Sequence, residues 1–446
     1  MESEQETPGA HPGGITRGDL VKRAGVGLGG LLVAPAAASA GAFSVTEGAA
    51  AANTIKIGFI SPRTGPLGGF GEPDPYILAQ AKKKLASGLT IGGKKYAVQL
   101  IAKDTTSSPV RAGQLARELI NRDKVDLILS TSTPETNNPV ADACEASGVP
   151  CISTVQPWEA WFFGRRGDPK KGFKSTFHFS FGVQNFANAY ISQWKTISTN
   201  KKVGVMWPND ADGNAIRAAL GPILKKAGYT IVDPGAYEDG STDFSAQISR
   251  FRSEGVQIFN TFPILPDFAT FWRQAAQQGL TRQIKIAQIA KTGLFPSQVE
   301  ALGTIGHKLA TADYWHPVFP YRWNLTGMTA RQLANGYEAS TGRQWNQNLG
   351  SSAALFDVAV AALKKSGNPK NKKAVSAAMM KLNVATPLGQ LNWAKGPVPN
   401  VVDTPIIGAQ WVKAPAGNKF KLLNLITEHA DDPRVPIQAK LKPFNT

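Results

Sequence analysis

Two residue types that often carry chemistry are scarce in this sequence of 446 residues. Cysteine occurs twice, as Cys144 and Cys151, and the five histidines are scattered along the chain. Neither type recurs at the close spacing that a zinc site needs, so we expect no bound metal. The chain also lacks the G-x-S-x-G, Walker and H-E-x-x-H signatures and a credible pair of catalytic carboxylates. We therefore expect no enzyme activity, no catalytic residues and no cofactor.

Long apolar runs and acidic residues are also in short supply. After the N-terminal region, no uncharged apolar stretch approaches the ~20 residues that cross a bilayer, so we expect no membrane span in the mature chain. Asp and Glu number 32 against 49 Lys and Arg, which gives a formal net charge of +17. The densest basic clusters, Lys82–Lys84 and Lys170–Lys171, neither alternate with aromatic residues nor match a DNA-binding motif. We expect no nucleic-acid partner and interpret the positive charge as solvated surface.

What remains is an ordinary globular composition in a long chain. Hydrophobic residues make up 42% and charged residues 18% of the sequence, values that are far from those of disordered or collagen-like chains. At ~150 residues per domain, the length corresponds to roughly three domain-sized pieces. The sequence therefore predicts a globular protein with more than one lobe and a large buried core.

The N-terminal residues have the order of an export signal. The segment Thr16–Arg23, which ends in Lys and Arg, precedes the apolar run Ala24–Ala38 and the small-x-small motif Ala38–Ala40. This order predicts an export signal and flexible N-terminus over residues 1–52, and hence a periplasmic or other extracytoplasmic protein. The spacing resembles a twin-arginine signal in which Gly18 replaces the second arginine, so the export route stays open.

The two cysteines lie close together in the sequence, with six residues between them. In an exported protein, a disulfide between Cys144 and Cys151 would join the end of one helix to the start of the next strand. The alternative is a pair of buried thiols. Of the two, we expect the disulfide.

From Asn53 onward, short apolar strands alternate with amphipathic helices, the pattern that builds parallel sheets covered on both faces. In the first series we expect strands at residues 54–60, 96–102, 125–129 and 151–153, with helices that end near Leu85, begin at Ser108–Pro109 and span 138–146. A second series follows, with strands at 202–207, 230–232, 257–261 and 285–288 and helices at 214–227, 244–253 and 267–278. The repeat predicts two doubly wound, Rossmann-like lobes.

After Ala312 the order changes. Three helical patterns, at residues 329–340, 353–365 and 371–382, come before short strands near 391–393, 407–412 and 420–425. Helices this late, followed by strands, indicate that the chain recrosses between the lobes to complete both. Ligands of such sheets bind outside the carboxyl ends of the strands, so we expect a site in the cleft between the lobes.

Four segments together resemble the branched-chain amino acid (Leu/Ile/Val) binding protein family, the type I periplasmic binding proteins of ABC importers. They are Gly58–Pro66, Lys103–Pro109, Gly148–Ser153 and Thr242–Gln247. The resemblance covers nearly all of the chain after the signal. It implies two lobes joined by a three-stranded hinge, residues 53–181 with 313–385 and residues 182–312 with 386–446. It also implies a monomer that closes on a small solute and delivers it to membrane permease subunits.

The resemblance also implies a set of binding residues. The family holds an amino acid's carboxylate with hydroxyls and backbone N–H groups after the third and fourth strands, and it places an aromatic residue in the first loop. The matching positions here are Phe70, Ser132, Thr133, Glu135, Thr136, Ser153 and Thr154. Trp158, which follows the fourth strand, could stack on a flat or apolar solute.

Two positions depart from the family's pattern. Asp212 replaces an aromatic residue of the second lobe, and Lys291 falls near the carboxylate that pairs with the ligand's ammonium. A lysine there would repel an ammonium and attract an anion, so we expect a solute other than leucine or valine. Glu135 and Asp212 could instead bind an amine or amide, or simply cap helices.

The leading hypothesis is a solute receptor that holds a small amino-acid-like compound with a carboxylate or amide and, as one option, an aromatic body. Two alternatives remain. One is an enzyme on the same scaffold, which would need a titratable pair in the cleft; the other is a ligand-sensing partner of a separate membrane receptor.

Overall fold

The computed structural model describes residues 53–262 and 267–446, all within one compact unit, Gly48–Thr446. The export signal predicted for residues 1–52 lies outside the described residues. Within the described part, no helix combines the length and the apolar character that crossing a bilayer requires.

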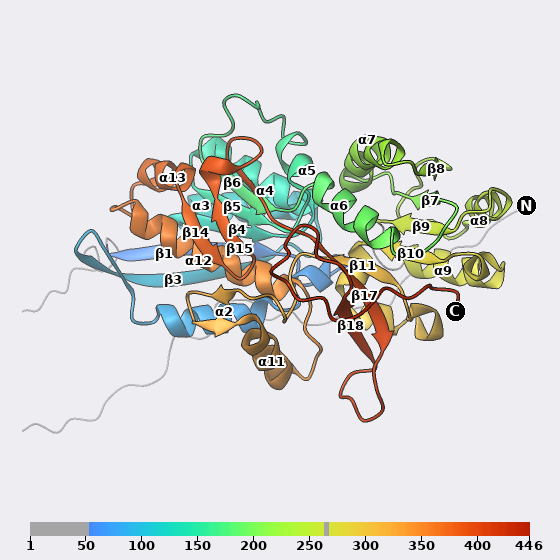
Figure 1. The fold of residues 1–446 in the computed structure, drawn as a ribbon. Coiled ribbons are helices and arrows are strands. Elements are labelled where there is room, and N and C mark those ends of the chain that lie inside the picture. Colours follow the sequence, from blue (N-terminus) through green and yellow to red (C-terminus); the bar gives the residue numbers. More distant parts are fainter. Residues whose placement is uncertain (1–52, 263–266) are drawn as a thin grey trace, which may run out of the picture. The chain divides into compact units, whose positions relative to one another are not determined.

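Seven strands form the first sheet, in the order β16-β6-β5-β4-β1-β3-β2 (Figure 1). Their bounds are β1 (Thr54–Ser61), β2 (Leu89–Ile91), β3 (Lys94–Asp104), β4 (Leu127–Thr131), β5 (Cys151–Thr154), β6 (Thr176–Ser180) and β16 (Val401–Asp403). All neighbouring pairs are parallel except β2 and β3, which form an antiparallel hairpin. In the central register, Ile57 of β1 is opposite Leu100 of β3 on one side and Leu127 of β4 on the other.

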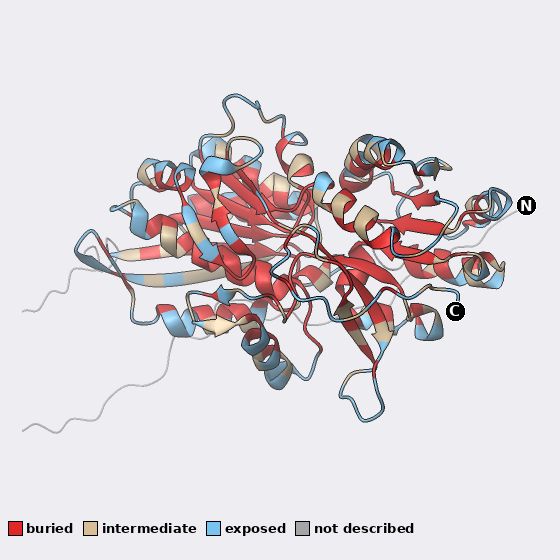
Figure 2. Ribbon diagram, viewed as in Figure 1, coloured by how far each residue is buried: buried red, intermediate tan, exposed pale blue. Residues whose placement is uncertain are grey.

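Helices cover both faces of this sheet. The elements that follow its strands are η1 (Gly68–Gly71), α2 (Asp74–Leu85), α3 (Pro109–Asn121), α4 (Pro134–Ser147) and α5 (Trp158–Phe162). Phe59 and Leu129 pack in one apolar cluster with α2 and with α12 (Asn348–Lys365), whereas Ile128 packs in another with α3 and α4. Because both faces are covered, every residue of the central strands β4, β5 and β6 is buried, whereas β3 has exposed and partly exposed residues along its length (Figure 2).

The second sheet has the order β18-β17-β11-β10-β9-β7-β8. Its strands are β7 (Lys202–Met206), β8 (Thr230–Val232), β9 (Ile258–Thr261), β10 (Ile286–Ile289), β11 (Ala310–Asp313), β17 (Ile407–Lys413) and β18 (Leu422–Ile426). Its helices are α6 (Val183–Trp194), α7 (Ala211–Lys226), α8 (Ser245–Ser253), α9 (Asp267–Gln277), α10 (Pro296–Glu300), η2 (Leu280–Arg282), η3 (Lys291–Leu294) and η4 (Gly303–Gly306). The strands run parallel except β17, which is antiparallel to both β11 and β18.

The described chain passes between the two sheets three times. It crosses from β6 to β7, returns after β11 to α12 and β16, and crosses again from β16 to β17. The returning segment contains β12 (Arg322–Trp323), β13 (Met328–Thr329), α11 (Ala330–Thr341), α13 (Lys372–Met380), β14 (Asn383–Thr386), β15 (Gly389–Asn392) and η5 (Trp393–Lys395). The expected fold class, two doubly wound halves joined by three crossings, is confirmed.

The sequence prediction omitted several elements. Among them are the short elements β2, α5, β6, β11 and β16 and the 12-residue helix α6. Strand β16 pairs with β6, with Val401 opposite His178, so this strand completes the first sheet although the sequence assigns residues 386–446 to the second lobe. Strands of three residues carry too little periodicity to be found from local pattern. The lobe bounds themselves stay a prediction.

Local signals fix several helix starts. Pro109 occupies the first turn of α3 and the Ser108 side chain accepts a hydrogen bond from the Arg111 N–H at 3.3 Å, as the sequence predicted. The Asp210 side chain likewise accepts the Gly213 N–H at the start of α7. This second cap places an aspartate in the loop that follows the carboxyl end of β7.

The expected disulfide is not formed. Cys144 on α4 and Cys151 at the start of β5 are both free and fully buried, in the apolar cluster between α3, α4 and the first sheet. Burial, together with a hydrogen bond to the Cys151 thiol, raises the pKa of Cys144 well above its usual range. The alternative of two buried thiols is therefore the correct description of this structure.

Candidate ligand site

A cavity with about 430 Å³ of empty space, part of it open to solvent, lies between the carboxyl ends of the two sheets. The loops after β1, β4, β5 and β6 contribute Phe70, Thr133, Val155, Pro157 and Phe181. The second sheet and α6 contribute Phe186, Asp212, Phe262, Ala290, Lys291, Leu294, Ala312 and Tyr314. Parallel strands end together at one edge of each sheet, which is why residues far apart in the sequence meet here.

Aromatic rings make up much of the cavity wall. The Phe181 ring lies 5.0 Å from Phe186 and 5.3 Å from Tyr314, and Phe186 lies 5.1 Å from Phe262. Phe70, which follows β1 of the first sheet, packs edge-on against Phe295, which follows β10 of the second sheet. Their ring centroids lie 5.0 Å apart. These contacts hold the rings in fixed positions, so the wall offers a rigid apolar surface to a solute.

Hydroxyl groups without partners gather at the ends of β4 and β5. Thr133 lines the cavity, is 2% exposed, and its Oγ1 has no hydrogen-bond partner among the described residues. Four more buried side-chain hydroxyls have no hydrogen-bond partner among the described residues: those of Thr131, Ser132, Thr136 and Thr154. An unpaired buried polar group costs about 1–3 kcal/mol. The arrangement is therefore suited to a solute that supplies the missing acceptors.

The amide of Asn137, which the sequence analysis did not single out, holds this region together. Its Nδ2 donates to the carbonyl oxygens of Ser132 at 2.7 Å and Thr154 at 2.8 Å, and its Oδ1 accepts from the Ser130 hydroxyl. One side chain on α4 thus fixes the ends of two neighbouring strands. An asparagine three residues into a helix, directly after a run of hydroxyl residues, was the available signal.

Lys291 does not present an unpaired cation to the cavity, which corrects the expectation from its sequence position. Its Nζ lies 2.9 Å from Asp212 Oδ2 and 3.0 Å from Asp210 Oδ2, and the lysine side chain is 9% exposed. Burial lowers the pKa of Lys291, but Asp212, Asp210 and Glu135 outweigh that effect and hold it well above its usual value. The lysine charge is matched within the protein before any solute arrives.

Asp212 is the cavity-lining member of this cluster. It is 3% exposed, and its Oδ1 has no partner among the described residues, although Oδ2 pairs with Lys291. Burial raises the pKa of Asp212 to about 7, Lys291 opposes this rise, and Glu135 and Asp210 add to it. The Oε1 atom of Glu135, at the start of α4, is also buried and unpartnered.

The other predicted site residues lie outside the cavity wall. Ser132, Thr136 and Thr154 are buried beside it, whereas the Ser153 hydroxyl lies within the sheet, 2.9 Å from His178 Nδ1. Trp158 is partly buried, and its ring packs 5.9 Å from Phe163. Binding roles for these residues stay predictions.

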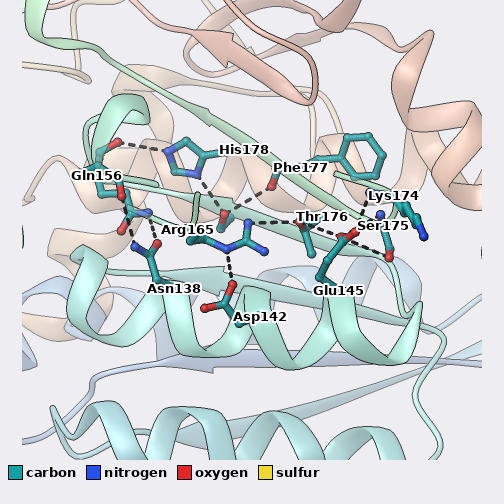
Figure 3. A network of polar contacts seen from close by, with 12 residues as sticks. Asn138, Asp142, Glu145, Gln156, Arg165, Lys174, Ser175, Thr176, Phe177 and His178 are labelled. Carbon is teal, nitrogen blue, oxygen red and sulfur yellow. Dashed lines mark hydrogen bonds and ion pairs between the residues drawn. The ribbon is translucent and has the colours of Figure 1, made fainter. Parts of the chain in front are cut away.

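A network of polar contacts supports the connection between β5 and β6, which carries Val155 and Pro157 (Figure 3). Arg165 donates to Asp142 at 2.7 Å, and its guanidinium carbon lies 4.6 Å from the Trp161 ring and 4.1 Å from the Phe173 ring. Glu145 of α4 accepts the backbone N–H groups of Lys174 and Ser175. Since α4 also begins at the cavity, this network anchors one wall of the site to the first sheet.

A second network links the cavity to the crossing after β11. The two carboxylate oxygens of Asp313 accept hydrogen bonds from Gln347 at 2.8 Å and from Asn424 at 2.5 Å. The adjacent Tyr314 donates its hydroxyl to Asn348, which in turn donates to the Phe70 carbonyl at 3.0 Å. Phe70 and Tyr314, two lining residues of the cavity, are therefore joined through Asn348.

Comparison with known proteins assigns this arrangement to a group. A family model described as periplasmic binding protein matches residues 54–414. An amino acid binding protein of Pseudomonas aeruginosa is 24% identical over 235 residues, which are 51% of this chain and 58% of the relative. A Leu/Ile/Val-binding protein homolog of Brucella melitensis is 24% identical over 276 residues, 61% of this chain and 67% of the relative. The chain thus spans less than two thirds of the first relative.

Solved structures share the fold. A solute binding protein of an ABC transporter from Rhodopseudomonas palustris, in complex with 3,4-dihydroxybenzoic acid, superposes with a TM-score of 0.68 at 20% identity, covering 85% of this chain and 99% of that one. The branched-chain amino acid transporter substrate binding protein LivJ from Streptococcus pneumoniae, in complex with isoleucine, gives 0.66 at 16% identity, covering 84% and 99%. One scaffold therefore accommodates solutes of different chemistry in these two proteins.

Proposed function

The chain belongs to the periplasmic binding protein family, and on that premise we propose that it carries a small solute to the membrane permease subunits of an ABC importer. Solute binding is the property that the family shares. Delivery to a permease, a location outside the cytoplasm and a monomeric state are parts of the proposal. They agree with the order of an export signal in the first 52 residues.

One observation supports the proposal above the others: a cavity bounded by both sheets contains buried polar atoms that no described residue satisfies. Thr133 and Asp212 line it from opposite sheets, and each has an oxygen without a partner. Proteins rarely leave such groups unpaired, since each costs free energy in the absence of a ligand. A solute that satisfies both groups at once would join the two sheets.

We propose that the solute is amino-acid-like, with a carboxylate or amide at one end and an apolar or aromatic body at the other. The hydroxyls of Thr133 and its neighbours at the start of α4 suit a carboxylate or carbonyl oxygen. The rings of Phe70, Phe181 and Tyr314 suit the apolar body. We propose that the solute leaves chemically unchanged; among the described lining residues, the Thr133 hydroxyl has no hydrogen bond to a base.

Binding would close the molecule about its three crossings. We propose that residues 53–181 with 313–385 move as one lobe and residues 182–312 with 386–446 as the other, apart from the β16 strand that pairs within the first sheet. The solute would then be released when the lobes separate at the permease.

A thermal-shift screen of the mature protein tests this function. The panel contains amino acids, aromatic acids, amides and short peptides, and a ligand above its Kd raises the Tm by mass action. Thr133→Val, which removes one cavity hydroxyl and keeps the shape, should reduce the shift, whereas Thr106→Val, on an exposed loop, should not. Small-angle scattering should record compaction with the same solute, and mass spectrometry should recover it unaltered. Absence of any ligand, or a chemically altered one, contradicts the proposal.

A further inference from the structure

The chain between α5 and β6, residues 163–174, places positive charge on the surface of the first half of the molecule. This basic loop holds five basic residues and one acidic residue, a formal charge of +4. It projects from the first sheet (Figure 1), and most of it is exposed (Figure 2). Four of its cations are exposed and form no ion pair with a described residue: Arg166, Lys170, Lys171 and Lys174. Charge gathered in this way without counter-ions attracts an anionic partner.

Acidic side chains in and beside the basic loop bind its backbone and do not pair with these four cations. Asp168 accepts the Lys170 N–H at 2.8 Å. Glu145 of α4 accepts the Lys174 N–H at 2.7 Å. These carboxylates shape the loop, and the exposed cations stay available to a partner outside the chain.

An exposed aromatic side chain begins the basic loop. Phe163 is 51% exposed, one of four large hydrophobic side chains that are this exposed among the described residues. Its ring packs against Phe162, with centroids 5.4 Å apart, and against Trp158 at 5.9 Å. A lone exposed ring is ordinary on a protein surface, but this one shares a short loop with four unpaired cations. Positive charge beside an exposed ring is typical of segments that lie at a membrane interface.

The basic loop is held from inside the molecule. The guanidinium of Arg165 lies between the Trp161 and Phe173 rings. It also pairs with Asp142, as Figure 3 shows. The Asn400 side chain accepts the Phe173 N–H at 2.9 Å and donates to the Phe173 carbonyl at 3.0 Å. Because these contacts order the backbone before any partner arrives, binding through the loop costs little conformational entropy.

We propose that the basic loop binds the anionic surface of a lipid membrane. Lysine and arginine side chains are attracted to anionic headgroups, and an aromatic ring beside them enters the headgroup region. A projecting loop meets a lipid surface without a complementary groove, whereas a folded acidic protein would need a surface shaped to the loop. None of the loop residues lines the cavity, so this contact is separate from the proposed solute site and does not rest on it.

Co-sedimentation of the mature protein with vesicles tests this inference. One set of vesicles contains phosphatidylcholine alone, and the other contains equal parts of phosphatidylcholine and phosphatidylglycerol. We expect association with the anionic vesicles only. The association should weaken as NaCl rises from 20 to 300 mM, because salt screens the attraction. No association with anionic vesicles at low salt would overturn the inference.

Two variants of equal charge separate the basic loop from the general positive charge of the protein. The loop variant carries four exchanges to glutamine: Arg166→Gln, Lys170→Gln, Lys171→Gln and Lys174→Gln. The matched control removes four exposed charges elsewhere on the same half, by Lys82→Gln, Lys83→Gln, Lys84→Gln and Lys95→Gln. Vesicle affinity should fall at least tenfold in the loop variant and less than threefold in the control. Equal losses would show attraction by net charge alone and overturn the inference.

The exposed ring has its own variant and control. Phe163→Ala removes it, and Ile437→Ala removes a side chain that is also 51% exposed. We expect affinity for anionic vesicles to fall about three- to tenfold in Phe163→Ala and to stay within twofold in Ile437→Ala. A Phe163→Ala protein that binds like wild type would contradict entry of the ring into the headgroup region.

Hydrogen–deuterium exchange of the wild type locates the contact without any substitution. On anionic vesicles, the backbone N–H groups of residues 163–174 should exchange more slowly. Those of the connection between β17 and β18, which also carries exposed lysines, should not change. Protection elsewhere with none in the basic loop would refute the assignment.

An acidic protein segment is the alternative partner. If the protein bound vesicles only when they contained a permease, and the loop variant lost this binding, the partner would be a protein and the inference would be wrong. The proposed function stands or falls separately, because the solute screen depends on the cavity and not on the basic loop.

Discussion

Arg165 has an unusual environment for a charged residue, with a side chain that is 1% exposed. Its guanidinium lies between the rings of Trp161 and Phe173, while its ion-pair partner Asp142 remains 60% exposed. Arginine tolerates such a place better than lysine, since its planar, weakly hydrated head stacks on aromatic rings. Most of its contribution therefore comes from packing.

We expect Arg165→Ala to lower the free energy of unfolding by about 2–4 kcal/mol, because it empties the space between two buried rings. Arg122→Ala, which removes an arginine that is 64% exposed, is the control and should change stability by less than about 0.5 kcal/mol. Urea denaturation at neutral pH measures both. A loss for Arg165→Ala no larger than for the control would refute this account.

His178 makes stability depend on pH. Burial lowers its pKa to about 3, although hydrogen bonds with the Gln156 carbonyl and with Ser153 oppose the shift. The unfolded chain, with an ordinary pKa near 6.5, binds a proton between pH 6.5 and pH 3 that the folded protein does not. This histidine therefore contributes stability that is present above pH 6.5 and is lost as the pH falls.

A comparison of wild type with His178→Gln isolates that contribution. The difference in unfolding free energy between the two proteins should shrink by about 2.7 kcal/mol from pH 7.5 to pH 4.5, at about 1.4 kcal/mol for each pH unit below 6.5. Carboxylates with raised pKa values, such as Asp74 and Asp357, act in both proteins and cancel in the difference. A pH-independent difference would show that folding does not lower the pKa of His178.

Among the elements, α12 makes an exceptionally close approach to the crossing segment after β11. A Cβ atom on Gly350 would lie 2.1 Å from the Trp315 ring, a separation that no side chain tolerates. Trp315 is itself fully buried, so it has no room to move aside. The glycine is needed for contact between the helix and the segment that links the sheets.

The corresponding prediction reverses the usual ranking of helix residues. Gly350→Ala should destabilise the protein by more than about 1 kcal/mol, although alanine normally exceeds glycine by about 1 kcal/mol inside a helix. Gly113→Ala on α3 is the matched control, since its Cβ would meet neighbours at an ordinary 3.5 Å and should be neutral or stabilising. Thermal unfolding of both variants tests this prediction. A Gly350→Ala protein as stable as wild type would disprove the steric argument.

The sequence predicted many elements from local pattern but missed others, including the 12-residue helix α6 and strands whose place depends on tertiary pairing. The apolar face of α3 and its Ser108–Pro109 start were visible in local pattern, and β8 was placed at its observed bounds. In contrast, β6 and β16 depend on each other across more than two hundred residues, so neither carries a local signal of its place in the sheet. Register between distant segments is decided by the assembled core.

At the scale of the whole molecule, the sequence predicted only part of the candidate site. The reason is again that distant segments meet only in the folded protein. Phe70, Thr133, Asp212 and Lys291 follow strands and were found from the loops. Phe181 and Tyr314 directly follow β6 and β11, and Phe186 lies on α6, three elements that the sequence prediction did not include. The sequence analysis treated Lys291 as an unpaired cation, because Asp210, 81 positions away, was not recognised as its ion-pair partner. The family itself, read from four short segments, is confirmed by the match over residues 54–414.

Asp313 connects both sheets at the second crossing, and its replacement tests closure about the crossings. It accepts from Gln347, ahead of α12, and from Asn424 on β18. In Asp313→Asn, one of these donors would face an NH₂ group, so we expect solute affinity to fall about five- to twentyfold as the closed form loses a hydrogen bond. Calorimetry with the solute found in the screen measures this.

Asp357→Asn is the control for that experiment. Its carboxylate also accepts two hydrogen bonds, from the backbone of Asn324 and Leu325, but neither comes from the second sheet. It should lower stability and leave affinity within about twofold of wild type. If both variants changed affinity alike, the Asp313 contacts would have no special part in closure.

The late position of β16 has a consequence for biosynthesis. The strand at the edge of the first sheet begins at Val401, in a chain of 446 residues whose first strand begins at Thr54. Neither half can assemble fully on the ribosome, because each awaits segments translated near the end. The edge of the first sheet at β6 therefore has no pairing partner until a segment more than two hundred residues further along the chain has been made.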